Sequence, residues 1–500
     1  METNRSLNNP LIAQGILEFS QTNATLYEPD ESSAAALPWI VVKKGHPYFF
    51  TERGRSWTPV GQNDAITWPD LKGAFMGKDL AAVETYLDKL VDAGVTCLRL
   101  MLEYCQGEHR YLEKPVGYFQ PHMVTLWDML FALCEKKGLR ILLTPYDTFW
   151  MWRRWARHPY RHTNGGPCAK RTAWLCCPRT RNAIKNRLTF ATQRWGRSGA
   201  LFAWDLWNEI HPAHSGNSHH PFYEFITDLS QHLRKTEQTL YGRSHLQTVS
   251  FFLPTLAKHP LVSDCAFDHP ALDFATLHFY EQHTIDNPKN TIDAAVATGR
   301  LVRQALHQIK DNRPFFDSEH GPIKKFSNRR PLPEPFDDEY FRHMQWAHLA
   351  AGGAGGGMRW PYRHPHSLTP GMRRAQKGMA GFLALLDWTG FNRRNLNEEV
   401  LFSDPELAVF ACGDATQAVI WLLRAGAVKR GPLRKNTRAK SCTISVPLLQ
   451  PGTYTVTCWD TVSGVAMETF FLNHSSSQVL PVSLPPVYTD LAIAIKRIAG

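Results

Sequence analysis

The sequence predicts an α/β protein, a (β/α)8 TIM barrel followed by a smaller C-terminal β-sandwich domain. Two observations lead to this fold class. From residue 38 to about 388, short apolar stretches alternate with helical stretches, the pattern of parallel strands joined by crossover helices. Beyond residue 394 the helical pattern stops, and short alternating strands separated by turn residues indicate a β-sandwich. We therefore expect an N-terminal extension (1–37), the barrel (38–390) and the β-sandwich (391–500).

The elements of the barrel can be assigned in order. The first strand is expected at 39–42, with 48–51 beside it across a turn at Gly45. Gly94 and Gly138 each follow a helical stretch, as glycines that end helices do. Further strands are expected at 96–102, 139–144, 201–208, 247–253, 274–279, 313–317 and 356–360, and helices at 79–93, 124–137, 181–195, 222–239, 292–310, 337–350 and 372–387.

About eight strand–helix units result, which favours a closed barrel with its functional groups at the carboxyl ends of the strands. A doubly wound open sheet is the alternative, but no glycine-rich phosphate loop follows an early strand. The C-terminal domain could bind a ligand or only brace the barrel. Its strands are expected at 407–412, 418–423, 441–446, 453–459, 467–472, 478–482 and 491–495, with a basic loop at 429–440.

Composition limits the class of protein. A chain of 500 residues with 43% hydrophobic and 20% charged residues is an ordinary globular protein of about two domains. The net charge of +11 could reflect an acidic substrate or nucleic acid. Because no recognition helix, zinc-finger spacing or RNA-binding signature accompanies this charge, we expect a basic surface and no nucleic-acid partner.

The N-terminus and the cysteines indicate a cytoplasmic protein. Residues 1–20 contain Arg5 but lack a compact apolar segment and a small-residue cleavage site. No apolar run is long enough to span a membrane. The ten cysteines show neither metal-type CxxC pairs nor the spacing of a small disulfide scaffold, so most should be free thiols. A cropped or nonstandard export signal remains an alternative.

Two glutamates stand at the ends of two apolar strands. The stretch LFAWDLWNE ends in Asn208 and Glu209, and RPFFDSE ends in Glu319, 110 residues further along. A retaining glycosidase needs one carboxyl group as acid/base and one as nucleophile, about 5 to 5.5 Å apart. Alone, either glutamate could equally be a surface carboxylate or a salt-bridge partner, but together at strand ends they point to this chemistry.

The two roles require opposite environments. Glu319 must be ionised to attack an anomeric carbon, so a cation such as Arg99 and a hydroxyl donor such as Tyr280 should hold its pKa down. Glu209 must begin protonated, so apolar walls such as Trp204 or Trp207, or the charge of Glu319, should raise its pKa.

Taken as an ordered set, these motifs resemble clan A glycoside hydrolases, and family 5 in particular, over residues 38–388. The resemblance implies roles for seven residues: Glu209 as acid/base, Glu319 as nucleophile, Asn208 as a ligand of the sugar 2-hydroxyl, and Arg99, His278, Tyr280 and Trp360 as substrate-site residues, with Trp360 as a platform under the sugar ring. The alternatives are an ion pair inside the barrel for Arg99, rim positions for His278 and Tyr280, and core packing for Trp360.

One position departs from the family pattern. Members commonly have a histidine at the end of strand three, where this chain has Tyr146 and Asp147. We expect one of these two side chains to contact the sugar, and the departure leaves the identity of the sugar open.

A long segment, 149–179, follows that strand and is rich in Trp, Arg and His. Long loops in compact domains are usually functional or disordered, and this one is too aromatic to be disordered. It is expected to cover the cleft, with Trp152, Trp155 and His158 as candidate substrate contacts. Packing within the loop is the alternative, and its arginines could meet an anionic sugar.

No metal or other cofactor is expected, because the histidine pairs lack a recognised ligand spacing such as HExxH. The sequence thus favours a retaining glycoside hydrolase that cleaves β-linked glycosides or short oligosaccharides and acts in the exo mode. Carbohydrate is the expected partner, and the oligomeric state is left open. The alternatives are an endo-acting β-glucanase or β-mannanase, transglycosylation at the same intermediate, and a non-catalytic glycan-binding barrel.

Overall fold

The protein is described from a computed structural model, which covers residues 37–104, 110–216, 219–324, 331–362, 366–427, 430–433, 438–475 and 478–498. The expected N-terminal extension therefore lies outside the described residues, apart from Leu37. Within these ranges, none of the helices combines the length and the apolar character needed to cross a membrane.

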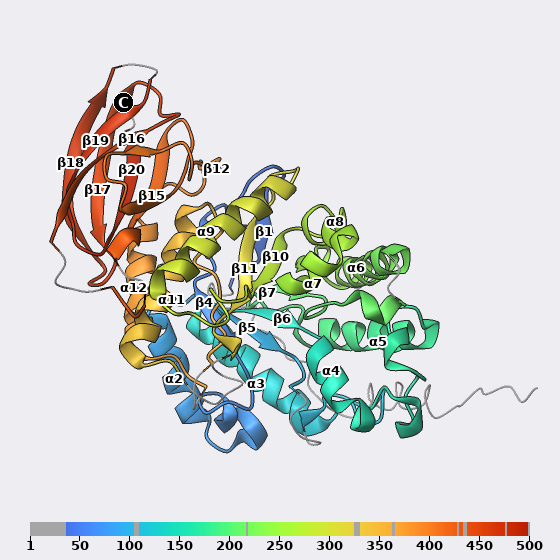
Figure 1. The fold of residues 1–500 in the computed structure, drawn as a ribbon. Coiled ribbons are helices and arrows are strands. Elements are labelled where there is room, and N and C mark those ends of the chain that lie inside the picture. Colours follow the sequence, from blue (N-terminus) through green and yellow to red (C-terminus); the bar gives the residue numbers. More distant parts are fainter. Residues whose placement is uncertain are drawn as a thin grey trace, which may run out of the picture.

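Parallel strands surrounded by helices form the larger part of the molecule (Figure 1). The first group pairs in chain order through β4 (Gly61–Asp64), β5 (Cys97–Met101), β6 (Arg140–Thr144), β7 (Leu201–Asp205) and β8 (Leu246–Thr248). The second group is β9 (Ser250–Phe252), β10 (Ala275–Phe279) and β11 (Phe315–His320). Arg359 forms parallel bridges with both Gln62 on β4 and His320 on β11, which links the two outer strands.

Helices alternate with these strands, which confirms the expected α/β pattern. Their ends follow local chemistry: Asp79 and Asn290 accept backbone N–H groups as N-caps, and Gly138 ends a helix in the left-handed conformation at φ 75°. The helices are α2 (Leu80–Asp92), α3 (Pro121–Lys137), α4 (Thr148–Arg154), α5 (Pro178–Trp195), α6 (His219–Tyr241), α7 (Leu253–Lys258), α8 (Ser263–Phe267), α9 (Thr291–Gln308), α11 (Glu334–Ala350) and α12 (Pro370–Leu383).

The expectation for the first strand was wrong. Residues 39–42 and 48–51 do not enter the parallel set but form β1 (Ile40–Val42) and β2 (Phe49–Thr51) of an antiparallel sheet with β3 (Ser56–Trp57). The ring of Phe49 packs edge-on against Phe202 and Phe274, which lie at the amino ends of β7 and β10. This small sheet therefore covers the end of the parallel strands opposite to their carboxyl ends, and β4 is the first parallel strand.

Three other expected elements differ in detail. The expected strand at 356–360 is reduced to a single bridging residue, Arg359. The expected strand at 247–253 is two short strands, β8 and β9, with different neighbours. The segment 149–179 is not one open loop, because α4 and short 3-10 helices at Trp155–Arg157, His162–Asn164 and Arg171–Ala173 shape it.

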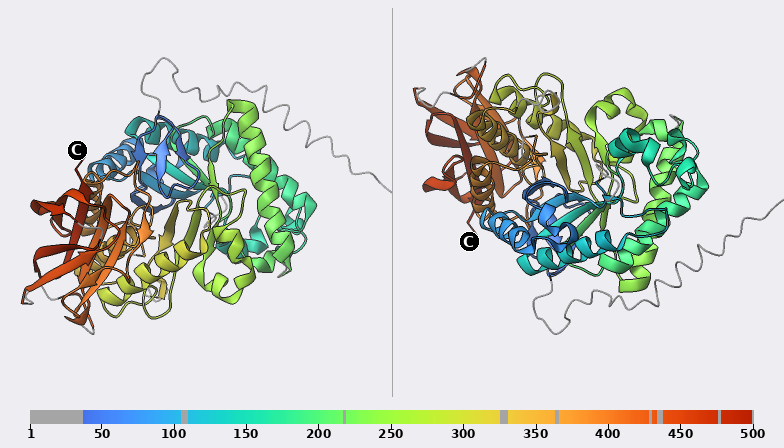
Figure 2. Two further views of the ribbon diagram at one scale, coloured as in Figure 1. Left: turned by 90° about the horizontal axis from the view of Figure 1, so that it is seen from above. Right: turned by 90° about the horizontal axis from the view of Figure 1, so that it is seen from below.

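The C-terminal residues form two antiparallel sheets, as expected, and both contribute side chains to one apolar core. Figure 2 shows them beside the larger part of the molecule rather than over its strands. Large apolar side chains from both parts, including Trp346, Phe382 and Trp421, share a second core between them. The strands are β12 (Arg394–Asn395), β13 (Leu401–Phe402), β14 (Leu407–Gly413), β15 (Gln417–Arg424), β16 (Lys440–Val446), β17 (Gly452–Asp460), β18 (Val465–His474), β19 (Leu480–Val487) and β20 (Asp490–Arg497).

Candidate active site

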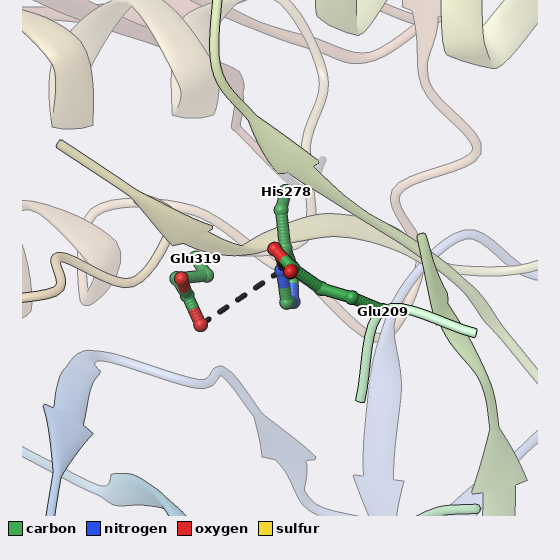
Figure 3. A group of neighbouring side chains, drawn as sticks. All are labelled: Glu209, His278 and Glu319. Atoms are coloured by element: carbon green, nitrogen blue, oxygen red, sulfur yellow. Dashed lines mark hydrogen bonds and ion pairs between the residues drawn. The ribbon is translucent and has the colours of Figure 1, made fainter. Parts of the chain in front are cut away.

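Glu209, His278 and Glu319 meet at the carboxyl ends of β7, β10 and β11 (Figure 3). One carboxylate oxygen of each glutamate and a ring nitrogen of the histidine all lie within 4.8 Å of one another. The side chains of Glu209 and Glu319 keep 20% and 8% of their surface exposed, so both carboxyl groups are mostly buried but still reach solvent. Two carboxyl groups this close can act on the same bond.

Glu319 is held by a cation and a hydroxyl group. Arg99 Nη1 lies 3.0 Å from its Oε2 atom, and Tyr280 Oη donates to its Oε1 atom at 2.7 Å. Burial raises the pKa of Glu319 to about 7, although Arg99 and the Tyr280 hydrogen bond act to lower it. The expected partners are therefore in place, and burial outweighs them.

Glu209 has a different environment. Its Oε1 atom lies 2.9 Å from Nδ1 of His278, whose pKa burial lowers well below its usual value, so this partner is neutral. Burial, followed by the charge of Glu319, raises the pKa of Glu209 well above its usual value. Glu319 therefore loses its proton first, and Glu209 is the group that stays protonated.

Trp204 and Trp207, the apolar neighbours expected for Glu209, have other partners among the described residues. Trp204 donates to Glu237 at 3.0 Å, and Trp207 stacks on Tyr146 with ring centroids 5.1 Å apart. The backbone of Glu209 itself is unusual, with φ at 49°, a left-handed conformation that costs about 1–3 kcal/mol for such a residue. Its N–H group is directed at Ser250 Oγ at 3.3 Å, which helps to hold this conformation.

Arg99 connects the site to the strands beneath it. The side chain is 1% exposed and donates to Asp205 Oδ2 at 2.8 Å and to Asn63 Oδ1 at 2.9 Å. It also donates to Asn208 Oδ1 and contacts Ser250 Oγ at 3.3 Å. From β5, one guanidinium group thus contacts residues of β4, β7, β9 and β11, so Arg99 is at once an ion-pair partner in the interior and a site residue.

Asp147 stands where the family pattern has a histidine. It caps α4 by accepting the Trp150 N–H at 2.6 Å, and it accepts Asn208 Nδ2 at 2.5 Å. Burial raises the pKa of Asp147 to about 6. The structure therefore places Asp147 behind Asn208, where it fixes which way the amide of Asn208 faces.

The aromatic residues at the site fall into two groups. Trp360 is partly exposed and packs edge-on against Trp68 with centroids 4.9 Å apart, so its ring lies in an aromatic wall. Tyr280 and Tyr362 are 3% and 6% exposed, and their hydroxyl oxygens are 2.6 Å apart.

The candidates from the segment after β6 pack mostly with one another. His158 is 1% exposed and lies among the rings of Tyr160 and Trp174, and burial lowers its pKa to about 3. Trp155 packs against Trp174. Tyr146 packs in the same way, with its hydroxyl 2.7 Å from that of Tyr160. In the described part of the chain, the ring contacts and hydrogen bonds of these three side chains do not include Glu209 or Glu319.

Trp152 lies closer to the segment that follows Glu209. Its ring lies 5.3 Å from that of His211, two residues after Glu209, and 5.2 Å from that of His214. It is partly exposed, which keeps it available to a bound molecule.

Sequence reasoning missed four residues of this site. Asn63 lies on the unrecognised strand β4, whose polar sequence Gly-Gln-Asn-Asp has no apolar alternation. Asp205 was visible as a charge within an apolar strand, which is a signal because a buried charge needs a partner. Ser250 and Tyr362 carried no such signal.

The Glu209, His278 and Glu319 atoms could also approach a cation. The positive charge of Arg99 at Glu319 opposes this. Among the described residues, the buried second ring nitrogen of His278 also has no hydrogen-bond partner of the kind that metal-binding histidines usually have. The arrangement suits proton transfer and nucleophilic attack better than metal binding.

No protein-family model matches the chain, and a search of curated proteins finds no significant match. Solved structures do resemble it. A family 5 glycoside hydrolase from Bacteroides vulgatus matches at a TM-score of 0.61 and 11% identity over 94% of this chain and 96% of that one. A structure described as a glycoside hydrolase matches at 0.60 and 11% identity over 92% and 97%.

A family 5 mannosidase from Rhizomucor miehei matches at a TM-score of 0.52 and 12% identity over 70% of this chain and 98% of that one. At these identities the likeness concerns the fold. The resemblance to family 5 drawn from the sequence is thus confirmed at the level of the fold.

Proposed function

We propose that this chain is a retaining glycoside hydrolase on a (β/α)8 barrel, with Glu319 as nucleophile and Glu209 as acid/base. The observation that carries the proposal is the pair of buried carboxyl groups with oxygens within 4.8 Å and unequal environments. A separation in this range matches retention and leaves too little room for the water that an inverting enzyme places between the groups. The bridges of Arg359 to β4 and β11, and the family 5 neighbours, support the barrel.

The proposed reaction has two steps, and both Glu319 and Glu209 take part in each of them. Glu319, ionised beside Arg99, attacks the anomeric carbon while Glu209 donates its proton to the leaving oxygen. Glu209, now a carboxylate, takes a proton from water, which attacks the glycosyl-enzyme and frees Glu319. Asn208, oriented by Arg99 and Asp147, would bind the sugar 2-hydroxyl, and Trp360 would support the ring.

We propose β-linked glycosides or short oligosaccharides as substrates, cleaved in the exo mode. The segment after β6 supports this choice, because its helix α4 carries Trp152 against His211, two residues after Glu209. The Rhizomucor miehei structure is that of a mannosidase with bound mannosyl-fructose, so a β-mannoside is the first compound to test.

The test is hydrolysis of aryl β-glycosides (mannoside, glucoside, galactoside, xyloside, fucoside and glucuronide) by the wild type and by Glu319→Gln and Glu209→Gln. We expect turnover of one or two sugars and a loss on the order of 10⁴-fold in Glu319→Gln. Glu468→Gln, on the exposed strand β18, is the matched control. The first product observed by proton NMR should have the β configuration.

An α product would disprove retention. If no aryl glycoside is cleaved, β-1,4-linked manno- and gluco-oligosaccharides distinguish the alternatives. Their internal cleavage would indicate an endo-acting enzyme, and binding without cleavage would indicate a glycan-binding protein.

A further inference from the structure

We propose that Tyr362 is a positioning residue for Glu319, which it affects through the hydroxyl group of Tyr280. The inference rests on the proposed glycosidase function. Tyr280 Oη donates to Glu319 Oε1 at 2.7 Å, and Tyr362 Oη lies 2.6 Å from Tyr280 Oη. Tyr362 follows the Arg359 bridge that links β4 and β11, so it approaches Glu319 from a different part of the chain than Tyr280 does.

The number of hydroxyl protons determines which tyrosine donates in the hydrogen bond between Tyr280 and Tyr362. A phenol has a single proton to donate, and that of Tyr280 is given to the carboxylate. While Glu319 is ionised, the short bond between the two hydroxyl groups therefore runs from Tyr362 to Tyr280. A hydroxyl group that accepts a hydrogen bond becomes a better donor, so Tyr362 strengthens the bond that Tyr280 makes to Glu319. Burial raises the pKa of both tyrosines well above the usual value, which keeps both protons in place.

The ring of Tyr362 packs against Gly321. This glycine lies two residues after Glu319 and has φ at +150°, a conformation that L side chains rarely adopt. A Cβ atom at this position would lie 2.5 Å from Cδ2 and 2.7 Å from Cε2 of Tyr362. The ring therefore packs directly on the backbone next to the nucleophile, and a side chain at 321 would displace it.

The hydrogen bonds from Tyr362 to Tyr280 and from Tyr280 to Glu319 affect the pKa of Glu319, as do the charges around it. Its Oε1 atom is held by Tyr280, and its Oε2 atom by Arg99, so loss of either donor favours the protonated carboxyl group. Within the described residues, the other titratable or charged groups that act on Glu319, Tyr280 or Tyr362 include Asp147, Glu209, His278, Asp317 and Arg359.

The test compares Tyr362→Phe, Tyr280→Phe and the double variant. For Tyr280→Phe we expect kcat to fall about 30-fold, and for Tyr362→Phe about 5-fold, with KM little changed in both. In both variants the acid limb of the kcat/KM profile should move to higher pH, further for Tyr280→Phe. Because Tyr362 acts through Tyr280, the double variant should match Tyr280→Phe. Tyr454→Phe, which removes a buried hydroxyl bond to Gln450 in the C-terminal sheets, should leave the profile unchanged.

A second readout does not depend on turnover. The carboxyl carbon of Glu319, assigned in ¹³C-glutamate-labelled protein by its absence from Glu319→Gln, should titrate at higher pH in Tyr362→Phe than in the wild type. Effects of the two tyrosines that multiply in the double variant, or an unmoved titration of Glu319 in Tyr362→Phe, would overturn the inference. If the wild type cleaves no glycoside, the proposed function fails, and the carbon titration still decides whether Tyr362 acts on Glu319.

Discussion

Arg99 and Glu319 form a buried ion pair, with Arg99 Nη1 3.0 Å from Glu319 Oε2. In the described part of the chain, the side chain of Glu209 has the neutral ring of His278, at 2.9 Å, as its hydrogen-bond partner. The two carboxyl groups, in one buried cluster, therefore differ in which of their protonation states is favoured. Under the proposed function, this difference favours Glu319 as nucleophile and Glu209 as acid/base.

Replacement of Asp147 by asparagine should shift both limbs of the pH–activity profile to lower pH. The charge of Asp147 raises the pKa of both Glu209 and Glu319, so removing it lets each lose its proton more readily. The oxygen of the new amide can still accept the Asn208 hydrogen bond, so kcat at the optimum should fall less than about tenfold. The kcat/KM profile between pH 4 and 9 measures the shift, and unmoved limbs would mean that Asp147 acts only by orienting Asn208.

Glu209→Ala should retain the first chemical step for substrates with good leaving groups but stall at the glycosyl-enzyme. The second step needs a base, and the space left by the side chain admits a small anion. Added azide should therefore raise the turnover of a dinitrophenyl β-glycoside about 10-fold or more and give a β-glycosyl azide. An α-configured azide product would contradict the assignment, and Glu319→Ala should not give the β product.

Loss of the Arg99 guanidinium should cost stability as well as activity. Arg99→Leu leaves Asp205 buried without its cation, so the free energy of unfolding should fall by about 3–5 kcal/mol. Arg99→Lys keeps the charge but cannot hold Asp205 and Asn63 together, so it should recover only part of the loss. Urea unfolding followed by tryptophan fluorescence measures both, and the exposed pair of Arg303 with Glu398 gives a control, Arg303→Lys, expected to change by less than about 0.5 kcal/mol.

Acid should destabilise the protein partly through His158. Burial lowers the pKa of His158 from 6.5 to about 3, so between these values the unfolded chain takes up a proton that the folded chain does not. Stability contributed by this group is complete above pH 6.5 and falls by about 1.4 kcal/mol per pH unit toward pH 3. His158→Asn should flatten the decline measured by urea unfolding from pH 7 to 4, and His220→Ala, at an exposed position, should not. An equal slope in His158→Asn would show that this ring takes up its proton in the folded protein too.

The sequence identified the catalytic candidates because strand ends are visible in it. An apolar run that stops at a polar residue gave Glu209 and Glu319, and the structure brings these two residues together with Arg99, Asn208, His278 and Tyr280. The periodic helices and the change to short strands after residue 394 were also readable, because apolar periodicity is a local property. Glycines such as Gly138 act locally in the same way.

The tertiary structure alone decided which buried polar residues find hydrogen-bond partners. Asn63 lies in a strand without apolar alternation, and it is stable there because its amide bonds to Ser318 and Met358 carbonyls and to Arg99, all distant in sequence. The contact of Tyr362 with Gly321 depends on the same kind of long-range packing. Sequence patterns report which face of an element avoids water, whereas hydrogen-bond partners and pKa values depend on what other elements bring to that face.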